Sequence, residues 1–231
     1  MKFHCLFEQS GTFKNEFKKL GYDAVDYDIC NDYGQTDIVI DLFEEIRKAY
    51  AGVASIFDNI KNEDQIIAFF PCTRFEAKIP LGFRGQMYQM KNWSDREKLI
   101  YGMKLHRELH ELYMLISQLV IVCIDRGLKL VIENPYTQPH YLTTYWCMRP
   151  KVIDYDRSER GDYYKKPTQY WFINCEPKEN FILEPQFVNK TRTTDTAKAE
   201  NGKSRQVVRS EIAPEYANRF IREFLLEDMN A

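Results

Sequence analysis

Several features that would place a chain in a special structural class are missing from these 231 residues. No apolar run approaches the ~20 residues that a membrane-spanning helix needs, so we expect no membrane association. The N-terminal segment, Met1–Phe7, lacks the layout of a secretory signal and leads directly into an apolar run. We also find no internal repeats. These absences favour a globular protein of the cytoplasm.

The cysteines lack the spacing of a zinc site or a disulfide framework. The six cysteines are widely scattered and form no C-x-x-C pair: Cys5, Cys30, Cys72, Cys123, Cys147 and Cys175. This distribution favours reduced thiols, as expected in a cytoplasmic compartment. The length and a hydrophobic content of 44% predict one α/β domain that spans residues 1–231.

The charge is unevenly distributed, although the net charge is only −2. Residues 23–64 carry eleven acids against three bases, whereas residues 188–209 carry six bases against two acids. An acidic half beside a basic loop is compatible with a polyanion that binds at one face. A solvated basic loop without a partner explains the pattern equally well.

The N-terminal residues predict the first half of a Rossmann-type unit. An apolar strand at Phe3–Phe7 leads through a turn with Ser10 and Gly11 into a helix at Phe13–Leu20. A second strand, Ala24–Ile29, follows and contains Asp28 near its end. Such a turn lets the backbone approach a ligand, and the acid can accept hydrogen bonds from two ribose hydroxyls. With a single glycine, an ordinary tight turn and a solvated aspartate remain an alternative.

A third strand is expected at Thr36–Leu42, where Asp41 could accept a hydrogen bond from an adenine amino group. The next apolar segment, Gln65–Phe75, reads as a strand that stops at Pro71 and presents Cys72. Chemistry in open α/β sheets is found at the carboxyl ends of the strands, so Cys72 is a candidate nucleophile. A buried cysteine that acts as a small hydrophobic residue is the alternative.

Residues 74–93 show neither a helical nor a strand period, and we expect an active-site loop there. The capping box Ser94–Glu97 then predicts a long helix that ends near Gly127. A strand at Leu128–Ile132 is followed by Glu133, a second acid at a strand end. Further elements are predicted near the C-terminus: a strand at Gln169–Asn174 and a helix at Ser210–Leu226.

Cys72 and Glu133 on neighbouring strands would suit one particular chemistry. A thiolate that adds to carbon 6 of a pyrimidine turns carbon 5 into a nucleophile, and an acid that bonds to the ring nitrogen stabilises the adduct. The order of motifs resembles the C5-cytosine DNA methyltransferase family in its compact phage and mobile-element form. The motifs that carry the resemblance are Phe7–Thr12, Asp28 and Asp41, Phe70–Cys72, Glu133–Pro135 and Arg209–Pro214.

The resemblance implies a Rossmann-like S-adenosylmethionine-dependent methyltransferase fold, a mixed sheet with helices on both faces. It implies Cys72 as nucleophile and Glu133 as partner of the ring nitrogen of a cytosine flipped out of duplex DNA. The implied S-adenosylmethionine ligands are Phe7, Ser10, Gly11, Thr12, Asp28, Asp41 and Pro71. The implied contacts to DNA are Arg74, Arg84, Lys165, Lys166 and Arg205.

The chain departs from the family at four places. The family's arginine-rich motif downstream of E-N-V is only loosely matched by Lys165–Gln169. Gln9 replaces a glycine of the first motif, and Thr73 replaces the glutamine after the Pro-Cys pair. Residues 176–208 are too few for a separate target-recognition domain, so we expect a reduced target-recognition loop and relaxed sequence specificity.

Three other functions remain open at this point. Asn134-Pro135-Tyr136 is similar to the N-P-P-Y motif of amino-group methyltransferases, although one proline is missing. A methyltransferase-like protein that binds DNA or cofactor without turnover would explain the altered first motif. RNA or a free nucleotide could also be the substrate.

Overall fold

Parallel strands alternate with helices through the N-terminal part of the chain, in the computed structural model that describes residues 1–182, 192–193 and 211–227. The strands of the main sheet are β1 (Lys2–Leu6), β2 (Asp23–Asp28), β3 (Ile38–Val39), β4 (Gln65–Ala68), β5 (Lys129–Pro135), β6 (Val152–Asp154) and β8 (Thr168–Ile173). A separate pair is formed by β7 (Tyr164–Lys165) and β9 (Arg192–Thr193). The fold is therefore mixed α/β.

The main sheet has seven strands in the order β3-β2-β1-β4-β5-β8-β6. The first five of these are parallel, and β8 runs antiparallel to both β5 and β6. The chain leaves β1 toward β2 and β3, and returns to pair β4 on the other side of β1. In open α/β sheets this reversal opens a crevice at the carboxyl ends of the two central strands.

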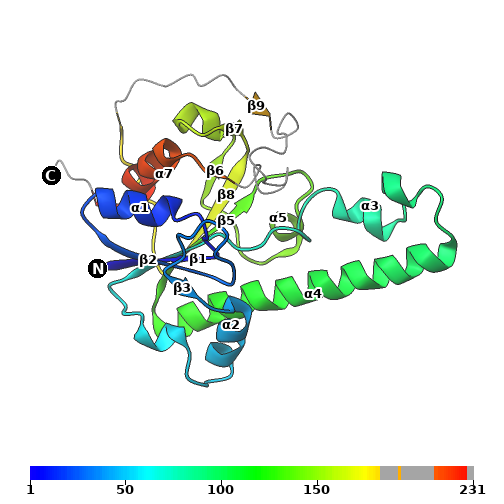
Figure 1. Cartoon of the computed structure of the whole chain (residues 1–231), viewed down its shortest axis with the longest axis horizontal. Helices are drawn as coiled ribbons and strands as arrows, with labels where there is room; N and C mark the ends of the chain where they lie inside the picture. Colours follow the sequence, from blue (N-terminus) through cyan, green and yellow to red (C-terminus); the bar gives the residue numbers. More distant parts are fainter. Residues whose placement is uncertain (183–191, 194–210, 228–231) are drawn as a thin grey trace.

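Helices cover both faces of the sheet (Figure 1). The α-helices are α1 (Thr12–Lys19), α2 (Leu42–Tyr50), α3 (Ile79–Phe83), α4 (Asp95–Arg126), α5 (Tyr141–Tyr145) and α7 (Pro214–Phe220). Shorter segments are η1 (Ile56–Asn59), η2 (Tyr88–Met90), η3 (Arg157–Arg160) and the π-helical η5 (Ile221–Leu225). None of the described helices is long and apolar enough to cross a bilayer.

Alternating side chains of the central strands divide the core into two halves. On β5, Val131 packs in the half that contains α1 and α7. Its neighbours Leu130 and Ile132 pack in the half that contains α2 and α4. Because these strands are buried on both faces, they appear in the sequence as continuous apolar runs, which is typical of parallel strands.

Local signals in the sequence place the ends of the long helix α4. Ser94 and Glu97 form the predicted capping box, and Gly127 ends the helix in the left-handed conformation with φ of 67°. The C-terminal part of α4 packs against the sheet and α2, whereas its N-terminal part extends well beyond the sheet and carries α3 (Figure 1).

Several predicted boundaries are wrong. The strand that begins at Gln65 ends at Ala68, because the chain turns away from the sheet before Pro71. The strand expected at Thr36–Leu42 has only two residues, and Glu133 lies within β5 rather than after it. The segment 74–93, expected to be a loop, contains α3 and η2 packed beside α4. The last helix begins at Pro214, and residues 194–210, where its predicted start falls, lie outside the described part.

Candidate functional site

Candidate residues from three strands meet at the carboxyl edge of the sheet. The first turn follows β1, Cys72 lies four residues beyond β4, and Glu133 lies near the end of β5. Because β1, β4 and β5 are adjacent and parallel, these three positions are neighbours in space. In open α/β sheets with this strand order, ligands bind at the carboxyl ends of the two central strands, which here are β1 and β4.

Aromatic rings connect the end of β1 to the end of β4. The ring of Phe7 lies 5.3 Å from that of Phe70 and 5.8 Å from that of Phe43, measured between centroids. Phe7 has a φ of 61°, a left-handed conformation that a side chain adopts at a cost. The predicted cofactor residue Phe7 therefore lies beside the segment Phe70–Cys72.

The predicted cofactor turn has a tight geometry. Gly11 has a φ of 66°, and a Cβ atom there would lie 3.3 Å from side-chain atoms of Lys14, Asn15 and Gln35. The Ser10 and Thr12 hydroxyls are 3.0 Å apart. Both the positive φ and the close packing explain a glycine at position 11.

Glu8 was not among the predicted site residues, yet it lies at the centre of this turn. Its buried carboxylate accepts hydrogen bonds from the backbone N–H groups of Phe13 at 2.7 Å and Lys14 at 3.2 Å. Burial raises the pKa of Glu8 to about 7. Glu8 thus caps α1 from inside the protein, and a sequence pattern that seeks glycines in the turn does not detect it.

The two acids predicted to bind the nucleoside occupy different settings. Asp28 is half-buried at the carboxyl end of β2, accepts a hydrogen bond from the Cys30 N–H at 2.8 Å, and has its pKa raised by burial. Asp41 is exposed and caps α2, because it accepts from the N–H groups of Phe43 and Glu44. Asp28 is therefore the better placed of the two for a ribose.

Cys72 lies in a turn whose hydrogen bonds hold it against β5. The turn closes through a bond from the Phe75 N–H to the Cys72 carbonyl, and the Phe75 carbonyl accepts from the Tyr141 N–H. Asn134 donates its side-chain amide to the Phe70 carbonyl at 2.8 Å. These contacts join the chain after β4 to the chain after β5.

The thiol of Cys72 is surrounded by charged side chains. Its Sγ atom lies 3.7 Å from Oε1 of Glu76, to which the thiol donates a hydrogen bond. Burial raises the pKa of Cys72 to about 12; the Lys166 ammonium opposes this shift, and the carboxylates of Glu76 and Glu133 add to it. All three charges therefore act at the sulfur.

A buried ion-pair network holds Glu133 in place. Arg157 is fully buried; its guanidinium lies 3.9 Å from Glu133 Oε1 and 2.5 Å from an oxygen of Asp162. The guanidinium also stacks on the Tyr216 ring at 4.5 Å, on α7. Oε1 of Glu133 is buried against this guanidinium and makes no hydrogen bond within the described residues.

The residues predicted to contact nucleic acid do not form one cluster. Lys166 lies near Cys72, and the Pro167 carbonyl next to it accepts from the Tyr136 N–H. Lys165 pairs with Asp156, and Arg74 pairs with Glu108. Arg84 is exposed beyond the end of α3, away from the sheet, and Arg205 lies outside the described residues.

The structure adds residues that the sequence motifs missed. Glu76, four residues after Cys72, could have been noticed as an acid one turn away from the nucleophile. Arg157 lies in a stretch of charged residues that indicates solvent exposure, so no sequence signal identifies it. His140 is buried beside Phe75 with both ring nitrogens lacking a partner among the described residues, and burial lowers its pKa to about 4.

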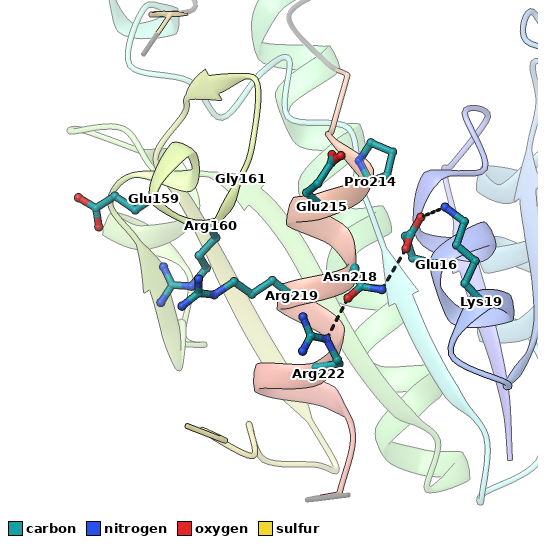
Figure 2. Close-up of a pocket in the computed structure, with 10 residues that line it drawn as sticks. All are labelled: Glu16, Lys19, Glu159, Arg160, Gly161, Pro214, Glu215, Asn218, Arg219 and Arg222. Carbon is teal, nitrogen blue, oxygen red and sulfur yellow. Dashed lines mark hydrogen bonds and ion pairs between the residues drawn. The ribbon is translucent and has the colours of Figure 1, made fainter. Parts of the chain in front are cut away.

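A cavity of about 480 Å³ lies elsewhere, between α1, α7 and η3 (Figure 2). Some of its lining side chains bond to one another: Lys19 pairs with Glu16 at 2.5 Å, and Asn218 donates to Glu16 at 3.0 Å. Arg160 pairs with Asp154 and Glu223. No predicted site residue lines this cavity.

Neither a scan against protein-family models nor a search of curated proteins finds a match for this chain. The functional assignment therefore depends on the residues and geometry described above.

Proposed function

We propose that the protein methylates carbon 5 of cytosine in DNA, with S-adenosylmethionine as methyl donor and Cys72 as nucleophile. The observation that supports this most directly is the meeting of Cys72, Glu133 and Lys166 at the carboxyl ends of β4 and β5. A thiol and a carboxylic acid at the ends of adjacent strands, next to the clustered rings of Phe7, Phe43 and Phe70, are the groups that this chemistry requires.

Residues at or after the ends of β1 and β2 suit the nucleoside part of S-adenosylmethionine. Phe7 and Phe43 offer half-buried rings to a base, and Asp28 offers a carboxylate to a ribose diol at the end of the adjacent strand. The N–H groups of Phe13 and Lys14 are already bonded to Glu8, so α1 does not offer them to the carboxylate of the cofactor. When bound, the cofactor supplies an electrophilic methyl group.

Covalent addition begins at Cys72. Because burial keeps the thiol protonated at neutral pH, its proton must leave as sulfur attacks carbon 6, and Glu76 accepts this proton. The new S–C6 bond moves the electron pair of the C5–C6 double bond toward carbon 5. After methylation, water takes the carbon-5 proton, the freed electron pair re-forms the C5–C6 double bond, and sulfur leaves carbon 6 as a thiolate. The proton held by Glu76 then returns to the sulfur and restores the thiol.

Glu133 supports the same step from the other side of the base. Its side chain is mostly buried, and in its carboxylic acid form it would donate its proton to the ring nitrogen, where negative charge develops during addition. Arg157 positions Glu133, because it is fixed by Asp162 and by Tyr216. Lys166 stabilises negative charge at the sulfur.

Amino-group methylation through Asn134 is less well supported. Asn134 is fully buried, and its side-chain N–H₂ donates to the carbonyls of Phe70 and Glu133. An amide that must contact the amino group of a substrate would have to break these bonds. The geometry therefore favours a structural role for Asn134, linking β4 to β5.

Transfer of labelled methyl from S-adenosylmethionine to duplex DNA, RNA and free nucleotides tests the proposal. We expect label on carbon 5 of cytosine in DNA, and its loss in Cys72→Ser, because serine is a far weaker nucleophile. Label on an exocyclic nitrogen would contradict the proposal, as would cofactor binding without transfer to any substrate. Cys147→Ser, which removes an exposed thiol outside the site, is the matched control.

A further inference from the structure

A helical arm projects from the body of the protein directly after the candidate nucleophile. Residues 77–107 form it, and comprise α3, η2 and the N-terminal part of α4. Figure 1 shows α3 stacked on this part of α4, well beyond the edge of the sheet. The arm has a small core of its own: Met90 and Leu105 are buried, and the ring of Phe83 stacks on His106 at 4.0 Å.

The arm carries a large positive charge for its size. Residues 77–107 contain seven Lys and Arg against two Asp and Glu, within a chain whose net charge is −2. The bases are Lys78, Arg84, Lys91, Arg96, Lys98, Lys104 and Arg107. Both acids belong to the first turn of α4, where their negative charge interacts favourably with the helix dipole. The rest of the chain is therefore acidic and the arm is basic.

Most of these cations have no acidic partner. Within the part of the chain that the structure describes, Lys104 is the only one of the seven in an ion pair, with Glu108 at 3.9 Å. Lys78, Arg84 and Lys91 lie in or next to α3 and η2, and all three are exposed. Uncompensated cations on a projecting element create a positive potential that attracts a polyanion.

Exposed apolar side chains accompany the cations. Tyr88 of η2 is 93% exposed, and on α4 Leu99 and Met103 are 69% and 74% exposed. Leu99 and Met103 lie on the face of α4 opposite Leu105, which packs beside Gly82 of α3. Aromatic and aliphatic side chains among cations are typical of nucleic-acid surfaces, where they contact bases and sugars.

We propose that the arm binds the phosphate backbone of duplex DNA through Lys78, Arg84 and Lys91, and so holds the target beside Cys72. This inference rests on the proposed function for the choice of duplex DNA. Lys78 is only six residues from Cys72 in the sequence, so the arm begins close to the reacting base and its phosphate contacts extend outward from there. Backbone contacts give affinity without sequence information.

Duplex binding measured by fluorescence anisotropy over a range of salt concentrations tests the inference without any methyl transfer. In Lys78→Gln/Arg84→Gln/Lys91→Gln, we expect affinity at low salt to fall roughly tenfold or more. The negative slope of log affinity against log salt should become less steep by about 2 to 3, because each phosphate contact contributes ~0.9 to its magnitude. The matched control is Lys2→Gln/Lys61→Gln/Lys129→Gln, which removes the same charge at the amino ends of the strands.

Three results would overturn the inference. The arm variant could bind duplex with the affinity and salt slope of the wild type, or the control could lose as much as the arm variant. The wild type could also bind phosphatidylserine vesicles but no duplex, which would assign the arm to a membrane surface. If the arm variant alone loses duplex binding while the wild type transfers no methyl group, the arm inference holds and the proposed function fails.

Discussion

The thiol of Cys72 is a poor nucleophile in the resting structure. Burial and two nearby carboxylates raise its pKa to about 12, so almost all of it is protonated at neutral pH. Nucleophilic thiols elsewhere usually have a lowered pKa. A protonated thiol can still attack if a base takes its proton during addition, and Glu76 is the carboxylate that accepts its hydrogen bond.

Glu76→Gln separates two effects of Glu76: its charge raises the pKa of the Cys72 thiol, and its carboxylate accepts the thiol proton. Removal of a negative charge near the sulfur lowers the thiol pKa, so alkylation of Cys72 by iodoacetamide at pH 8 should become faster. Methyl transfer should become slower by about 10² to 10⁴, because the proton acceptor is lost. Peptide mass spectrometry follows alkylation of Cys72 separately from the exposed Cys30 and Cys147.

The opposite directions of these changes distinguish a base from a structural residue. If Glu76 only maintained the local fold, its loss would expose the thiol of Cys72. Alkylation would then rise at the buried cysteines as well as at Cys72. Methyl transfer that stays within twofold of the wild type would exclude Glu76 as the proton acceptor. Glu63→Gln, an exposed acid before β4, serves as the control.

At the scale of elements, α1 depends on an internal cap rather than on a conventional one. Its N-cap residue, Gly11, has no side chain to accept a hydrogen bond, and Glu8 provides the acceptor. Because Glu8 is buried, its folded pKa of about 7 lies above its ordinary value of 4.5. The carboxylate is therefore more costly to ionise in the folded state than in the unfolded state.

The stability of the wild type should decrease as pH rises through this interval. Between the unfolded and folded pKa values, the folded state binds one proton more than the unfolded state, so the free energy of unfolding falls with pH. The loss approaches about 3 kcal/mol above pH 7, at ~1.4 kcal/mol per pKa unit. Glu8→Gln should lack this decrease, as measured by urea unfolding at pH 5 and pH 8. Parallel pH profiles of the two proteins would contradict the interpretation.

The sequence predicts the two ends of α4, but not that its N-terminal part belongs to the arm. The capping box at Ser94 and the glycine at 127 mark both ends of α4, because these signals act within one turn of the chain. Nothing local shows that the N-terminal part of α4 leaves the sheet. That outcome depends on α3, whose Gly82 allows Leu105 of α4 to approach closely.

At the scale of the whole molecule, the C-terminal helix is joined to the site by buried charges. Asp162 binds Arg157 on one side and accepts from the Ala213 N–H on the other, just before α7 begins. Arg157 in turn contacts Glu133 and the Tyr216 ring. One end of the sheet, η3 and α7 therefore share a single network.

Arg157→Met should destabilise the protein by about 3–5 kcal/mol, because it leaves the Asp162 carboxylate buried without its partner. Arg157→Met/Asp162→Asn should recover much of this loss, since it removes both charges and keeps an acceptor for the Ala213 N–H. Thermal and urea unfolding of the two variants provide the measurement. Equal destabilisation of the single and double variants would show that Arg157 acts through packing instead.

The sequence by itself determined the features that act over short range. The alternation of strands and helices, the capping of α4, the turn at Gly11 and the positions of Cys72 and Glu133 near the ends of β4 and β5 follow from local periodicity and turn chemistry. Such patterns are readable because each involves residues within a few positions of one another.

Only the tertiary structure decided which charges surround Cys72 and Glu133. Glu76, Arg157 and Lys166 reach the site from three different segments, and their effects depend on burial. The folding of α3 onto the N-terminal part of α4 within the arm also depends on packing between these helices, which a weak local period cannot reveal. Contacts between distant segments form when strands pair and helices pack. A single sequence does not specify which distant residues these steps bring together.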